Sequence, residues 1–217
     1  MITERDSSKG GLAGLVSVAL FFLGWFIYGN GPTVADEPIV ILEFFTNNHD
    51  QVIWSMFVQG VGSLAMIWFM AVLVLVMVDE NESLLALITA LSFVIALTLG
   101  SAATIMRSGL AFISVGDISP DTAALIFYLG STIDTCQNIF SAGFFIAVAA
   151  AVLRSGFLNA AWGWVSILAG MYAIVTTTAL NHSGFWSPHK AGFFNLVFYI
   201  VWVGGTGILL MKRKSAA

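Results

Sequence analysis

Residues 131–141 read STIDTCQNIFS and contain Asp134, the only carboxylate inside any long apolar segment of the chain. The polar residues of this stretch follow one another at i, i+3, i+4 and i+7, which places them on one face of a helix. They are Asp134, Gln137, Asn138 and Ser141. In lipid, such a face must point toward protein or water, because an amide or carboxylate in hydrocarbon is costly. The stretch therefore predicts a membrane helix with a polar face turned inward.

The composition is that of an integral membrane protein. Of the 217 residues, 59% are hydrophobic and 9% are charged, whereas soluble domains carry about 25% charged residues. The formal net charge of −4 leaves no basic surface for nucleic acid. The single cysteine, Cys136, excludes an intramolecular disulfide. The length suits one domain that covers residues 1–217.

Six apolar segments are long enough to cross a bilayer as helices. They cover residues 11–29, 51–78, 83–106, 122–153, 158–180 and 193–211. Segment 122–153 is too long for one straight span, so we expect its first turns either to stand in the outer interface or to bend near Gly130. Residues 38–45 are amphipathic enough to lie along the membrane surface. The predicted fold is an all-α polytopic bundle of six transmembrane helices.

The distribution of lysine and arginine predicts the orientation of these helices. If both termini are cytoplasmic, the inner side holds most of the basic residues, as the positive-inside rule requires. The inner set is Arg5, Lys9, Arg154, Lys212, Arg213 and Lys214, and the outer set is Arg107 and Lys190. We therefore expect a multi-pass protein of the cell inner membrane with both termini in the cytoplasm.

The polar residues inside the apolar segments fall mostly in the outer half of the predicted bundle. If their faces converge, they line a polar cavity that opens to the outer side. The candidates for binding a substrate there are Ser55, Gln59, Gln137, Asn138, Tyr172 and Asn195, with Ser101 and Thr104 nearby. The alternative is that these groups form hydrogen bonds between helices, which contribute about 0.6 kcal/mol each.

Asp134 and Arg107 are the candidate catalytic residues. Both lie near the outer ends of their predicted helices, so we expect them to pair. One interpretation is a structural ion pair. The other is an acid whose proton affinity is set by burial and by the arginine, and which protonates an alkene, epoxide or carbonyl.

The three histidines, His49, His182 and His189, are all expected on the outer side. Three imidazoles with a carboxylate would suit zinc, but their spacing matches no metal motif. No histidine lies inside an apolar segment, which excludes a haem held between helices. We expect neither a metal nor another cofactor.

Small residues at Gly143, Ala147 and Ala151 are spaced four apart, as in helices that approach closely. The run Gly204-Gly205-Thr206-Gly207 favours either close packing or local unwinding of the last helix.

Two stretches resemble patterns in small bacterial integral membrane proteins of the DUF4386 type. They are FFTNNHDQ at residues 44–51, followed by Trp68-Phe69, and RSGFLNAAWGW at residues 154–164. The resemblance implies a six-helix fold in a bacterial inner membrane, and it implies no activity. Small membrane-bound terpene cyclases are similar in size and in their use of helix carboxylates, but none of their motifs aligns with this chain.

The sequence favours a membrane enzyme that acts on a lipophilic small molecule, such as an isoprenoid or polyketide, by acid–base chemistry as a cyclase or isomerase. The expected partners are membrane lipids and this substrate, with no nucleic acid. Two alternatives stay open: a non-catalytic membrane subunit or lipid-binding protein, and a small proton-coupled transporter.

Overall fold

The computed structural model describes residues 2–113, 116–178 and 187–213, without the side chains of residues 189–192 and 195. These residues form helices and their connections, and the described part contains no β-strand. The eight helices are α1 (Glu4–Tyr28), α2 (Pro38–Asn47), α3 (His49–Asp79), α4 (Ser83–Ala111), α5 (Pro120–Cys136), α6 (Asn138–Ser155), α7 (Ala160–Thr176) and α8 (Pro188–Lys212). The predicted all-α class is confirmed.

Four stretches are long and apolar enough to cross a membrane: α1, α3, α4 and the combined stretch Pro120–Ser155. α7 and the Leu196–Lys212 part of α8 are shorter apolar helices. Several boundaries differ from the expected ones. α1 begins at Glu4, ahead of the apolar segment, because Thr3 and Asp6 cap it reciprocally. α4 continues past Arg107 to Ala111, whereas α7 ends at Thr176.

The long segment expected at 122–153 is divided into two helices at Gln137, and the expected bend near Gly130 is wrong. Gly130 lies inside α5, where a Cβ would be in ordinary van der Waals contact with α4, 3.4 Å from the backbone oxygen of Ala103. The interruption follows Thr132 and Thr135, whose hydroxyls donate to carbonyl oxygens one turn back. Such side-chain bonds compete with the helix ladder and commonly bend it.

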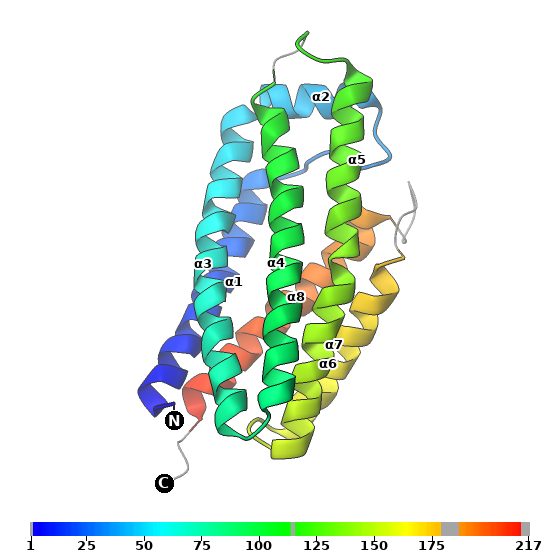
Figure 1. Ribbon diagram of the computed structural model, residues 1–217. Coiled ribbons are helices and arrows are strands. Elements are labelled where there is room, and N and C mark those ends of the chain that lie inside the picture. Colours follow the sequence, from blue (N-terminus) through cyan, green and yellow to red (C-terminus); the bar gives the residue numbers. More distant parts are fainter. Residues whose placement is uncertain (1, 114–115, 179–186, 214–217) are drawn as a thin grey trace.

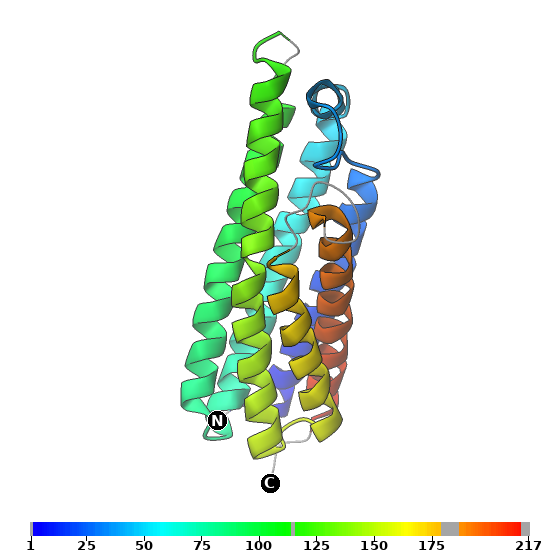
Figure 2. The ribbon, with the colours of Figure 1, turned by 90° about the vertical axis from the view of Figure 1, so that its right-hand side faces the viewer.

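α2 lies across one end of the bundle, which we call the α2 end (Figures 1 and 2). Its buried face consists of Ile41, Leu42 and Phe45, while Ile39 and Val40 are exposed. The Phe45 ring packs against Phe127 of α5, with 6.0 Å between centroids. α2 therefore covers the end of the bundle with its apolar face turned inward.

An aromatic cluster closes the middle of the bundle further from the α2 end. The Trp202 ring of α8 lies 4.9 Å from the Phe144 ring and 5.3 Å from the Phe145 ring of α6. It also meets Phe69 of α3 edge to face, and its indole N–H donates to the Ser166 hydroxyl of α7 at 2.7 Å. Side chains from four helices thus form a packed layer across the bundle.

The described parts of both termini lie at the end opposite α2, together with the α3–α4 turn (Figure 1). Ion pairs at this end link the α3–α4 turn to the ends of α6 and α8. Glu82 pairs with Arg154 at 3.3 Å, and Glu80 pairs with Arg213 beyond α8. We call this the terminal end.

Glycines allow the helix backbones to approach closely. A Cβ on Gly207 would lie 2.8 Å from the backbone oxygen of Gly11, so α1 and α8 meet backbone to backbone. α8 runs through its glycine-rich stretch without unwinding. On α6, a Cβ on Gly143 would lie 2.9 Å from the Ser92 hydroxyl of α4. The small residues of α6 and α8 therefore allow close helix packing. For residues 204–207, close packing was one of the two structures that the sequence favoured.

Candidate functional site

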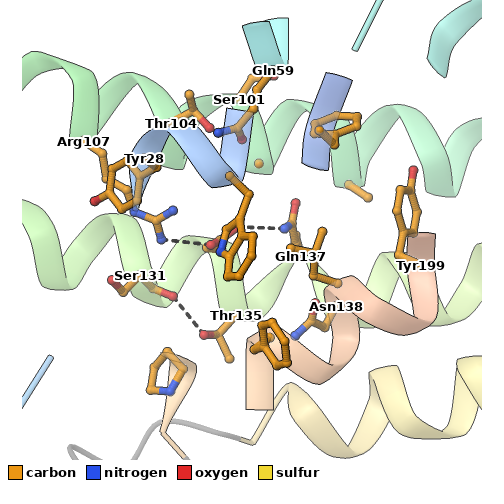
Figure 3. Close-up of a pocket in the computed structure, with 18 of the residues that line it drawn as sticks. Tyr28, Gln59, Ser101, Thr104, Arg107, Ser131, Thr135, Gln137, Asn138 and Tyr199 are labelled. Carbon is orange, nitrogen blue, oxygen red and sulfur yellow. Dashed lines mark hydrogen bonds and ion pairs between the residues drawn. The ribbon is translucent and has the colours of Figure 1, made fainter. Parts of the chain in front are cut away.

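A cavity of 630 Å³ lies inside the bundle between the α2 end and the aromatic cluster. Most of its helical wall comes from α1, α3, α4, α5, α6 and α8, and residues 29–34 border it at the α2 end. Apolar side chains such as Phe21, Met66, Phe93 and Phe144 form much of the surface. Polar groups gather on the walls formed by α4, α5 and α6 (Figure 3). Cavities of this size and character are typical of small-molecule sites.

The centre of the polar wall is a pair of charged residues. Arg107 Nη2 on α4 donates to Asp134 Oδ2 on α5 at 2.8 Å. They are the two charged residues among the described ones that line the cavity. The Arg107 side chain is 24% exposed and that of Asp134 is 37% exposed, so the cavity reaches both. The expectation that the two residues pair is met.

The other oxygen of Asp134 is held by Gln137. Gln137 Nε2 donates to Asp134 Oδ1 at 2.8 Å, so both carboxylate oxygens accept hydrogen bonds. Gln137 is itself confined by Gly100 of α4, where a Cβ would lie 2.5 Å from Gln137 Oε1. The glycine leaves room for the amide beside the carboxylate.

The helical spacing in residues 131–141 has the expected consequence. The four polar residues of the predicted face all line the cavity: Asp134, Gln137, Asn138 and Ser141. The face continues one turn back with Ser131 and Thr135. In Figure 3, Gln137 lies between α4 and the α5–α6 stretch, whereas Thr135 and Asn138 lie on the side of that stretch that faces α8.

On the opposite wall, Gln59 of α3 lines the cavity and Ser55 does not. Ser55 is fully buried, and its hydroxyl donates to the Gly24 oxygen of α1 at 2.8 Å. The same hydroxyl accepts from Gln59 Nε2 at 3.0 Å. Ser55 therefore positions Gln59 and joins α3 to α1.

The two remaining candidates for substrate binding are Tyr172 and Asn195. Tyr172 of α7 is not among the residues that line the cavity, and its ring packs on Phe198 of α8 at 5.0 Å. Asn195 belongs to α8, but its side chain lies outside the described residues.

The histidines do not come together in the described part. His49 lies at the α2 end, with its Nδ1 3.0 Å from Asp50 and its ring against Phe112. His182 and the side chain of His189 lie outside the described residues. Within the described residues no three histidine, cysteine, aspartate or glutamate side chains form a group that could hold a metal ion.

Tyr28 lines the cavity although the sequence did not single it out. It is the last residue of α1, and Figure 3 shows its ring beside Arg107. Its ring also contacts Gly31, where a Cβ would collide with it, so the loop after α1 fits over the tyrosine. A tyrosine at the end of an apolar segment is usually an interface anchor, and nothing in the sequence links it to an arginine on another helix.

No family model, no curated protein and no solved structure matches the chain.

Proposed function

We propose that the protein is a bacterial inner-membrane protein that crosses the bilayer six times with both termini in the cytoplasm. The four long apolar stretches, with α7 and α8 as the shorter crossings, support this proposal. The basic residues Arg5, Lys9, Arg154, Lys212 and Arg213 belong to the terminal end, which agrees with the positive-inside rule. The α2 end, and with it the cavity, then faces the outer side.

In this arrangement the cavity binds a lipophilic small molecule of isoprenoid or polyketide type. The observation that carries the proposal is the Arg107–Asp134–Gln137 array on the wall of a largely apolar cavity. An apolar cavity holds the body of such a molecule, while a few placed polar groups orient its reactive end. The protein then acts on the molecule by acid–base chemistry, as a cyclase or isomerase.

Asp134 carries the proton transfer. The sequence favoured Asp134 as the acid, but because both of its oxygens accept hydrogen bonds, we propose that it acts first as a proton acceptor. It becomes a proton donor only after it has taken a proton from the substrate. An isomerisation needs this sequence, since a proton leaves one carbon and returns to another. Arg107 and Gln137 orient the carboxylate, and Gln59 and Asn138 position the substrate.

A second candidate is a non-catalytic lipid-binding protein or subunit. It is favoured by the same hydrogen bonds, because a carboxylate with both oxygens paired is also what a structural ion pair requires. A transporter is less well supported, because the aromatic cluster around Trp202 separates the cavity from the terminal end.

The test is conversion of lipophilic precursors. Membranes that contain the wild-type protein or Asp134→Asn are incubated with isoprenoid and polyketide precursors, and the extracts are compared by mass spectrometry. We expect a product that the variant fails to form although it remains folded by size-exclusion chromatography. A product formed equally by both proteins removes Asp134 from catalysis. No product from either protein favours the non-catalytic candidate.

A further inference from the structure

The charges in the cavity wall constrain the ligand. Arg107 and Asp134 are the charged residues among the described lining, and they neutralise each other at 2.8 Å. An anionic head group would have to compete with Asp134 for the guanidinium, and a cationic one would compete with Arg107 for the carboxylate. Either would leave one partly buried charge without its partner, which is unfavourable. An uncharged head group leaves the pair intact.

The wall nevertheless offers unused hydrogen-bond donors. A guanidinium carries five N–H donors, and Arg107 makes one hydrogen bond to the described residues, through Nη2. The Tyr28 hydroxyl makes none to the residues that the structure describes, and Figure 3 shows its ring beside Arg107 at the cavity. Arg107 and Tyr28, on different helices, thus each bring a hydrogen-bond donor to the same part of the cavity.

The other end of the cavity is mostly apolar, although Tyr199 also lines the cavity and its ring packs against Phe145. Met66, Phe93 and Phe144 line this end, and they belong to the aromatic and aliphatic core that continues to Trp202. A ligand that satisfies both ends has an acceptor oxygen at Arg107 and Tyr28 and a hydrocarbon body directed toward Phe144. The gradient from donors to apolar surface fixes its orientation.

We infer that the ligand of this cavity is an uncharged lipophile with an oxygen head group, of the alcohol, ketone or quinone class, held by Arg107 and Tyr28. This inference deepens the proposed function and rests on it. It excludes phosphorylated isoprenoids and fatty acids as the preferred ligands. These molecules are anions, and the positive charge of Arg107 is already paired with Asp134.

The experiment compares ligands that share one hydrocarbon chain. Radiolabelled farnesol, farnesoic acid and farnesyl diphosphate are bound to the full-length protein in detergent by a scintillation proximity assay. We expect farnesol to bind at least about tenfold more tightly than either anion. Tyr28→Phe removes one donor and keeps the ring, so it should weaken farnesol binding by about fivefold. Tyr172→Phe is the matched control, because Tyr172 does not line the cavity, and it should bind as the wild type does.

The possible results distinguish the inference about the head group from the proposed binding of a lipophilic molecule. Tighter binding of either anion overturns the neutral head group but leaves a lipophile-binding cavity standing. Equal loss of binding in Tyr28→Phe and Tyr172→Phe, or no loss in either, overturns the role of Tyr28. If none of the three compounds binds, the inference fails, and the proposed function is then decided separately by what co-purifies with the protein.

Discussion

Arg107 on α4 and Asp134 on α5 are joined by a hydrogen bond of 2.8 Å that faces the cavity rather than the lipid. The bond links two helices across the polar wall, and it leaves one Asp134 oxygen for Gln137. The pair therefore has two roles that can be measured separately, namely the stability of the bundle and the orientation of a carboxylate toward a ligand.

For stability, we predict a coupling energy of about 1–2 kcal/mol between Arg107→Gln and Asp134→Asn. Each single variant leaves a partly buried charge or amide without its partner, and the exposure of the pair to the cavity moderates the cost. The measurement is a double-mutant cycle from thermal unfolding in detergent.

The matched cycle uses Glu82→Gln and Arg154→Gln at the terminal end. The Arg154 side chain is 68% exposed, so we expect a coupling energy below about 1 kcal/mol there. Equal coupling energies in the two cycles would contradict the idea that partial burial strengthens the interaction between Arg107 and Asp134.

The position of Gln137 can be tested without changing any polar residue. Gly100→Ala places a methyl group against Gln137 Oε1, which should push the amide away from Asp134. The bundle should tolerate the change, since the neighbour is the flexible end of a side chain and alanine favours helix by about 0.5–1 kcal/mol. We expect unchanged or higher thermal stability together with weaker ligand binding or turnover.

Gly109→Ala on the same helix α4 is the control, because no atom lies within 4 Å of its added Cβ and Gly109 does not line the cavity. It should gain the same helix stabilisation and keep full binding. A Gly100→Ala protein that behaves like Gly109→Ala would show that Gln137 does not matter for the site.

The contact between α1 and α8 predicts a position-specific defect. Gly207→Ala forces a methyl group toward the Gly11 carbonyl, which is backbone and cannot rotate away. We expect a loss of about 1–3 kcal/mol in the free energy of unfolding, as for other overpacked sites. Gly204→Ala on the same helix meets no atom within 4 Å, so it should be neutral or stabilising. The same loss at both positions would refute the backbone contact.

The proposed topology predicts which residues are reached from each side. In a Cys136→Ser background, cysteines are introduced at the exposed positions Glu37, beside α2, and Ser83, at the start of α4. A membrane-impermeant maleimide applied to intact spheroplasts should label Glu37→Cys and should label Ser83→Cys only after lysis. The reverse pattern would invert the orientation, and labelling of both from outside would place both ends on one side.

Much of the polar seam could be predicted because the backbone stays helical through Gln137, between α5 and α6. The spacing of Asp134, Gln137, Asn138 and Ser141 determines a common face wherever the helix packs. The pairing with Arg107 followed from two residues near the same ends of neighbouring apolar segments. These features need only helical geometry and the cost of polar groups in lipid.

The remaining features depend on how helices rotate against one another. Tyr172 was expected in the cavity but lies away from it, because the rotation of α7 about its axis is determined by its packing and not by its own residue spacing. Ser55 lies behind Gln59 for the same reason. Tyr28 lies beside Arg107 because of how the end of α1 is placed against α4, which no periodicity indicates. The interruption at Gln137 arises from hydroxyl-to-backbone bonds whose effect on a helix is not fixed by sequence alone.

The most direct test of the account is native mass spectrometry of the protein purified in mild detergent, with two threonine variants of α4 beside the wild type. Thr104 lines the cavity, whereas Thr98 is exposed and bonds its own helix at Val94. We predict one defined lipophilic compound bound to the wild type and to Thr98→Phe, and its loss from Thr104→Phe, where the ring fills the cavity. Only bulk phospholipid, the same in all three proteins, would contradict a ligand-binding cavity and leave Arg107 and Asp134 as a structural ion pair.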